Sequence, residues 1–168
     1  MSKAFTKEDG IDVPELVPAG APLPEGVINY VTTRGLALLE AEQQQLQSAL
    51  HALSQQSLSE ADKRLQQASL QARLSDLDLR LQSAQWVDSQ RQPQDKVHFG
   101  ACVDLLTEAD EQKHYQIVGV DEADAASGRI SFLSPLARAL LGLEVGDVVE
   151  LTTPNGLQEL EIIAIRYP

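Results

Sequence analysis

Leucines recur at helical spacing in two stretches of this chain, one on each side of a short polar segment. The first stretch has spacings of three, seven, four and three residues, and the second has spacings of four, three, four and three. The residues are Leu36, Leu39, Leu46, Leu50 and Leu53, with Gln43 at the vacant position, and then Leu70, Leu74, Leu77, Leu81 and Ala84. Such heptad spacing is typical of helices that pack along one apolar seam. Because residues 54–59 predict a turn, we expect an antiparallel two-helix coiled-coil hairpin.

The helix starts carry their own signals. A threonine in the segment Thr32-Thr33 precedes the first leucine run, and Ser59 precedes the second, so hydroxyl side chains are available to accept the first free helix amides. The alternative is that the seam pairs with a second copy of the chain. Two short helices joined by a turn favour the hairpin within one chain.

After residue 95 the hydrophobic period falls to two, which predicts strands. Alternation over 97–105 indicates the first strand and 115–119 its partner, followed by 129–133, a short helix from Ser134, and strands over 147–152 and 160–167. The Asn155-Gly156 pair between the last two strands is a strong hairpin signal. The chain therefore belongs to the α+β class, with the helical hairpin followed by a curved antiparallel sheet and one short helix.

These patterns divide the chain into four parts. Residues 1–29 are rich in proline and glycine and are expected to form a flexible tail. The coiled-coil hairpin is expected at 30–88, a polar linker at 89–95, and the globular domain at 96–168.

Charge and composition exclude several functions. The net charge of -12 argues against a protein that wraps duplex nucleic acid, since phosphate binding needs clustered lysine and arginine. The three histidines lie far apart, and the one cysteine, Cys102, has no histidine close in sequence, so neither a zinc site nor a catalytic thiol is expected. The start has no apolar core behind a basic head, and no run approaches about 18 apolar residues. We expect a cytoplasmic protein that does not contact membranes.

Several short motifs resemble one family. They are Phe99-Gly100-Ala101-Cys102-Val103, the stretch 117–124, Gly128-Arg129-Ile130-Ser131, the stretch 134–142, Val145-Gly146-Asp147-Val148-Val149 and Ile165-Arg166-Tyr167. Together they make residues 96–168 similar to the C-terminal domain of the GreA/GreB transcript-cleavage factors of bacterial RNA polymerase. Residues 31–39 and Trp86-Val87-Asp88 are similar to the two ends of that family's helical arm.

The resemblance implies an FKBP-like globular domain that docks on the rim of the polymerase secondary channel, with the coiled coil as a finger inside the channel. The partner is then bacterial RNA polymerase, and the protein is expected to act as a monomer and not as an enzyme. In the family, two carboxylates at the finger tip help to hold the second Mg²⁺ of the polymerase active site. No intrinsic cofactor is implied, only sharing of that Mg²⁺.

The acidic tip motif of the family is absent from this chain. The nearest carboxylates are Glu60 and Asp62, which follow the predicted turn. They could serve a metal, or they could stabilise the start of the second helix together with Ser59, and the two roles are compatible. The finger is also about a dozen residues shorter than in the cleavage factors, which shortens its reach by roughly 9 Å. Cleavage, channel occupation without cleavage, and a protein-interaction role unrelated to polymerase all remain open.

The resemblance also predicts a docking surface. The loop Leu133-Ser134-Pro135 and the neighbouring Arg138 are expected to face the polymerase rim. The same residues have a structural role, because Ser134 is placed to cap the short helix and Pro135 to occupy its first position. Some cleavage factors have an acidic residue where this chain has Leu133.

Overall fold

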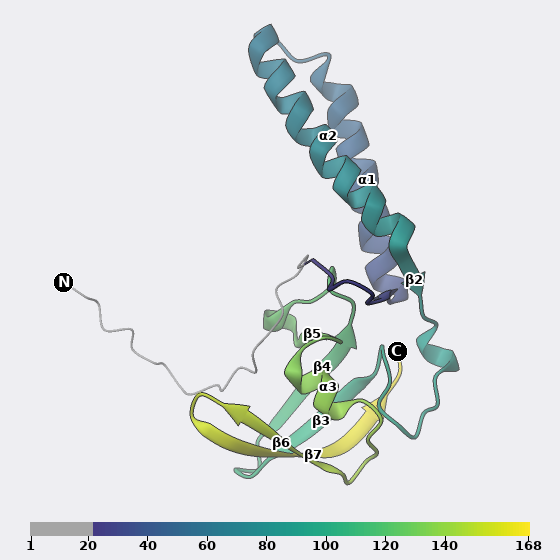
Figure 1. The fold of residues 1–168 in the computed structure, drawn as a ribbon, viewed down its shortest axis with the longest axis vertical. Helices are drawn as coiled ribbons and strands as arrows, with labels where there is room; N and C mark the ends of the chain where they lie inside the picture. The colour runs from purple at the N-terminus through teal and green to yellow at the C-terminus, as the bar shows by residue number, and fades with distance from the viewer. Residues whose placement is uncertain (1–21) are drawn as a thin grey trace, which may run out of the picture.

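The structure is a computed structural model that describes residues 22–168. Two long helices, α1 (Thr33–Leu53) and α2 (Glu60–Ser83), form a hairpin that projects from a globular domain built on a curled sheet (Figure 1). The predicted tail lies mostly outside the described residues. None of the helices within 22–168 combines the length and apolar character needed to cross a membrane.

The hairpin is held by the predicted leucine seam. Leu39, Leu46 and Leu77 are buried, and Leu36, Leu70, Leu74, Leu81 and Ala84 pack against them. Gln43, which replaces a leucine in the repeat, donates from Nε2 to Asp78 Oδ1 across the two helices at 2.6 Å. The heptad prediction and the pairing of the two helices within one chain are therefore confirmed.

The base of the hairpin is closed by a small sheet that the sequence pattern did not predict. Strand β1 (Asn29–Val31) enters α1, strand β2 (Ala84–Trp86) leaves α2, and the two pair in parallel. Asn29 is buried and donates from Nδ2 to the Arg80 carbonyl at 3.2 Å. Strand β1 thus begins at Asn29, the last residue assigned to the tail. A 3-10 turn, η1 (Ser89–Arg91), lies in the expected linker. The four domain boundaries stay predictions.

The globular domain has a five-stranded sheet in the order β5-β4-β3-β7-β6. Its strands are β3 (Cys102–Thr107), β4 (Gln112–Val118), β5 (Arg129–Ser131), β6 (Val148–Thr153) and β7 (Gly156–Arg166). All neighbouring strands are antiparallel except β4 and β5, which are parallel. The sheet is therefore mixed, because the chain crosses over between β4 and β5 through a loop that contains the 3-10 turn η2 (Ala125–Ser127). The FKBP-like detail stays a prediction.

The first strand of this sheet starts later than the alternation predicts. Residues 97–101 lie outside the strand, and Phe99 and Gly100 form a turn in which Gly100 has a φ of 90° that residues with side chains rarely adopt. Val97 and Ala101 are nonetheless fully buried, like Val103 and Leu105 of β3. The alternating pattern therefore identified four of the five inward positions as buried, with Phe99 half-buried, and it missed the buried Asp104 on the other face; the strand covers only the second half of the stretch.

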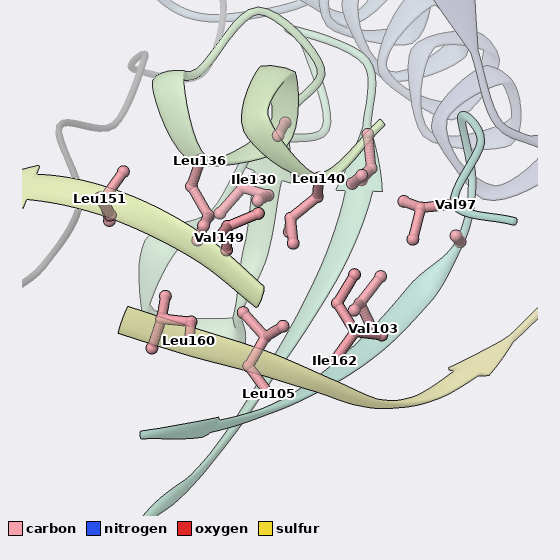
Figure 2. Close-up of a cluster of buried hydrophobic side chains, with 13 residues drawn as sticks. Val97, Val103, Leu105, Ile130, Leu136, Leu140, Val149, Leu151, Leu160 and Ile162 are labelled. Atoms are coloured by element: carbon pink, nitrogen blue, oxygen red, sulfur yellow. The ribbon is translucent and has the colours of Figure 1, made fainter. Parts of the chain in front are cut away.

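The core lies between the sheet and the short helix α3 (Pro135–Leu140), as Figure 2 shows. Leu136 and Leu140 of α3 point toward Leu105, Leu160 and the rest of a cluster of buried residues from the strands. Removing this apolar surface from water contributes about 25 cal/mol for each Å² that is buried. The predicted turn at Asn155-Gly156 joins β6 to β7, so this hairpin prediction is confirmed.

On the other face of the sheet, one buried carboxylate links three strands. Asp104 of β3 accepts two hydrogen bonds from the Arg166 guanidinium of β7, at 2.5 and 3.0 Å. Its Oδ1 also lies 2.7 Å from Nδ1 of His114 on β4. The hydrogen bonds from Arg166 lower the pKa of the Asp104 carboxyl below its usual range, although burial alone would raise it.

We predict that Asp104→Asn destabilises the globular domain by about 1 to 2 kcal/mol near neutral pH, because the variant loses charge-assisted hydrogen bonds. The unfolded chain binds a proton at Asp104 at a higher pH than the folded chain does, so this contribution is complete above about pH 4. It is lost as the pH falls through the lowered pKa of the folded state. Thermal unfolding of wild type and variant between pH 3 and 7 measures the difference, and it should shrink at the acidic end. Glu111→Gln, an exposed acid in the neighbouring turn, is the control and should change stability by less than about 0.5 kcal/mol.

Candidate functional site

The tip of the hairpin presents the two carboxylates that the sequence singled out. Glu60 and Asp62 lie in the first turn of α2, and both are exposed. At 1.5 Å per residue the 24 residues of α2 carry this turn about 36 Å from the base of the hairpin. The carboxylates are thus at the far end of the projecting arm.

The two carboxylates are not equivalent. Ser59 caps α2 by accepting from the Asp62 amide at 3.1 Å, and the Ser59 hydroxyl donates back to Asp62 Oδ2 at 2.6 Å. The capping role predicted for Asp62 is therefore present in the structure. Residues two apart on a helix point about 200° away from each other, so Glu60 and Asp62 do not converge on one point. Glu60, in contrast, has no hydrogen-bonding partner among residues 22–168.

Glu60 borders an open groove between the two helices near the tip, with a volume of about 680 Å³. Three basic side chains, His51, Lys63 and Arg64, line the same groove, together with Leu50 and Gln67. The seam is polar here on the α2 side, so the helices enclose less apolar surface than they do near the base. The tip therefore combines one free carboxylate with two cations, Lys63 and Arg64.

The tip has too few ligands to hold a metal ion by itself. Within residues 22–168 no three histidine, cysteine or acidic side chains come together in a group that could bind one. A structural or catalytic metal needs at least three protein ligands in most sites.

The second predicted site, the loop before α3, is held rigidly. Ser134 is fully buried, its Oγ accepts from the Ala137 amide at 3.3 Å, and its own amide donates to Ser131 O at 2.9 Å. Leu136 and Leu140 anchor the helix in the core. Ser134 therefore shapes the loop from inside and offers no surface of its own to a partner.

The outward-facing members of this site are Pro135 and Arg138, which are exposed, and Leu133, which is half-buried. Pro135 occupies the first turn of α3, where its missing amide costs no hydrogen bond. Arg138 is one turn further along the helix, and no carboxylate in the described part of the chain pairs with it. Of the predicted docking residues, only Leu133, Pro135 and Arg138 thus reach the surface, and we call these three the docking patch.

Sequence reasoning missed the residues that connect the hairpin to the globular domain. Asp121 pairs with Arg80 of α2, and Glu122 pairs with Arg34 of α1 at 3.0 Å. Asp121 and Glu122 lie within the stretch 117–124 that resembles the family, but no local spacing indicates their partners, which are about 40 and 90 residues away.

Ser59→Ala is expected to loosen the tip. Loss of the capping hydroxyl costs about 1 kcal/mol, so protection of the amides in the first turn of α2 against hydrogen exchange should fall about fivefold. Ser57→Ala changes the same chemistry in the adjoining exposed turn and should leave exchange unaltered. Equal exchange in wild type and Ser59→Ala would show that the cap does not order the tip.

Comparison with protein families gives one model that matches. It is described as "Transcription elongation factor, GreA/GreB, C-term" and matches residues 92–167, which span the sheet, α3 and the docking patch.

Curated relatives match over more of the chain. A protein named transcription elongation factor GreA from Methylobacterium sp. (strain 4-46) is 41% identical over 152 residues, covering 82% of this chain and 96% of the relative. Its namesake from Pseudomonas aeruginosa is 39% identical with the same coverage. Since 82% of 168 residues is about 138, about 14 of the 152 aligned positions have no counterpart in this chain. That number agrees with the expected shortening of the chain.

Two solved structures are also similar. One is titled "Prokaryotic transcription elongation factor GreA/GreB from Nitrosomonas europaea", with 25% identity, a TM-score of 0.42, and coverage of 82% of this chain and 98% of the other. The other is GreA factor homolog 1 of Thermus thermophilus, with 24% identity, a TM-score of 0.40, and coverage of 82% and 97%. On the identity and coverage of the curated relatives, this chain belongs to the GreA/GreB family of transcription elongation factors.

Proposed function

We propose that this protein binds bacterial RNA polymerase through its globular domain and directs the helical hairpin along the secondary channel, where it modulates elongation. The observation that carries the proposal is the projecting hairpin, whose tip presents a free carboxylate, Glu60, about 36 Å from its base. A hairpin of this length places its tip far from the globular domain, so docking and the effect on transcription use different surfaces of the protein. Family membership supports the choice of polymerase as partner.

The chemistry at the tip follows from the difference between Glu60 and Asp62. Mg²⁺ prefers oxygen ligands and keeps open positions for waters and substrate, so a single carboxylate from a second protein is able to join its coordination. Glu60 is free to do this, whereas one oxygen of Asp62 is engaged by the Ser59 hydroxyl. The metal is the polymerase's own, and this chain supplies no cofactor.

Two observations favour a second candidate, channel occupation without cleavage. The tip offers one free carboxylate where the family's mechanism uses two, and the chain lacks about 14 positions that its relatives have. A carboxylate several ångströms short of the metal cannot ligate it, because these bonds are about 2 Å long. In that case the hairpin would slow elongation by filling the channel.

The charge and topology of the chain limit its other contacts. With a net charge of -12, the surface repels duplex phosphates and suits a basic protein surface. The apolar seam is satisfied within one chain, so we propose that the protein acts as a monomer. Its place is the cytoplasm, where the polymerase works.

Transcript cleavage on a backtracked polymerase complex tests the tip. If the protein stimulates cleavage, Glu60→Ala should lower the rate at least about tenfold, whereas Asp62→Ala should act more weakly, through the helix start. Glu40→Ala, an exposed acid of α1 remote from the tip, is the control and should leave the rate unchanged.

The possible outcomes of this assay distinguish cleavage through the tip from channel occupation without cleavage. Stimulated cleavage that the double variant Glu60→Ala/Asp62→Ala leaves intact would show that the tip assignment is wrong. Slowed elongation without cleavage would identify a non-cleaving channel occupant. Absence of binding to core polymerase at micromolar concentration would contradict the whole proposal.

The docking patch is tested by Arg138→Ala. An exposed charge pair contributes about 1 kcal/mol, so binding to core polymerase should weaken up to about tenfold, and less at high salt. Arg91→Ala removes the same charge from an exposed site in η1 and should bind like wild type. Equal affinity of the two variants would exclude Arg138 from the interface.

A further inference from the structure

One loop of the globular domain contacts both helices of the hairpin through two consecutive acidic residues. Asp121 forms an ion pair with Arg80 in the last turn of α2. Glu122 forms an ion pair with Arg34 at 3.0 Å, at the first turn of α1. We call Asp121 and Glu122 the acidic clamp.

Glu122 is also tied to the cap of α1. The Thr32 hydroxyl accepts from the Gly35 amide at 2.9 Å and donates to Glu122 Oε2. A carboxylate near a helix N-terminus and a cation near a helix C-terminus both lie where the helix dipole favours them. Glu122 is therefore favoured at the start of α1, and Asp121 contacts the end of α2 through the Arg80 cation, which is favoured there.

The clamp is shielded from water, unlike the surface ion pairs of the hairpin. The side chain of Glu122 is 2% exposed and that of Asp121 is 10% exposed, whereas the carboxylate of the exposed pair between Arg73 and Glu42 is 49% exposed. Solvent and salt weaken exposed pairs to a small fraction of their Coulomb energy. A buried carboxylate that loses its partner leaves an unpaired charge away from water, so its contacts are maintained.

The backbones beside the clamp approach so closely that a side chain would not fit. A Cβ atom at Gly119 would lie 2.4 Å from the carbonyl oxygen of Tyr30, which is in β1. The Tyr30 ring packs against Phe99 and Phe132 of the globular domain, with ring centroids 5.7 Å apart in both cases. These aromatic contacts hold β1 against the globular domain, but they involve no side chain of α1 or α2.

To fix the direction of the hairpin, each of its two helices must be held separately. A single polar contact would let the hairpin turn about it. Here Asp121 holds α2 through Arg80 and Glu122 holds α1 through Arg34, both from the same loop. Phe132, which packs on Tyr30, immediately precedes Leu133 of the docking patch. The clamp, the aromatic contact and the docking patch therefore form one continuous unit.

We propose that Asp121 and Glu122 are positioning residues that set the direction of the hairpin relative to the docking patch, so that docking of the globular domain aims the tip. The consequence for transcription rests on the proposed function. The direction of the hairpin is a property of the free protein and is measured without polymerase.

Double electron–electron resonance on the full chain tests the direction. Spin labels are placed at Gln56→Cys in the tip turn and Glu108→Cys in the turn after β3, both exposed, in a Cys102→Ser background. The protein with an intact clamp should give one narrow distance distribution. Asp121→Asn/Glu122→Gln, which keeps shape but removes charge, should broaden or shift it.

Two variants keep this test decisive. Glu159→Gln/Glu161→Gln removes the same charge from exposed positions of β7 and should leave the distribution narrow. Arg34→Gln, at a half-exposed position, releases one arm only and should broaden the distribution less, even if the double clamp variant folds poorly. An unchanged distribution in folded clamp variants, checked by near-UV circular dichroism, would overturn the proposal.

With polymerase, the clamp variant should keep its affinity, since the docking patch is intact, while the effect of the tip on elongation or cleavage falls about tenfold or more. If the clamp only stabilised the fold, its loss would lower both the affinity for polymerase and the effect of the tip, or neither of them. Either result would overturn the proposal. If no variant binds polymerase, the proposed function fails, whereas the distance measurement still decides the role of the clamp.

Discussion

The chain that enters α1 is held on both sides, by strand β2 leaving α2 and by the sheet of the globular domain. Val31 accepts from the Val87 amide at 3.0 Å, while Tyr30 packs against Phe99 and Phe132. A two-helix hairpin with one leucine seam buries little surface, and most of the stability of a helix in a protein comes from packing of its apolar face. The base contacts close the open end of the seam and give the arm a defined origin.

From that origin, the seam becomes less apolar toward the tip on the α2 side only. Leu53, at the tip end of α1, is buried like Leu39, Leu46 and Leu77, whereas α2 has Gln67 and Lys63 beyond Leu70. Regions with few buried apolar contacts open locally at low free energy. The α2 side of the tip is therefore expected to open more easily than the base, which the pairing of β1 with β2 closes.

The sequence predicted the parts of the molecule that depend on local spacing. The leucine repeat, the cap at Ser134 and the turn at Asn155-Gly156 are all confirmed, because each is specified within a few residues. The pairing of β1 with β2 was missed, since each strand has three residues and they are over 50 positions apart. The clamp was missed for the same reason, because charge complementarity across a fold leaves no periodic signal. At the tip, the spacing of Ser59 and Asp62 did predict the cap.

The cap at the tip also reduces the number of free carboxylates there, which is one way in which members of a family can differ in action. Ser59 draws Asp62 back onto its own helix, and helical geometry turns Glu60 to another side. A sequence that stabilises the start of α2 with its acidic residues therefore has fewer carboxylates to offer a metal. Under the function proposed above, a shorter finger and a capped tip act in the same direction, since both leave fewer carboxylates within reach of a metal. The core of the globular domain contains no residue of the hairpin, so neither change touches it.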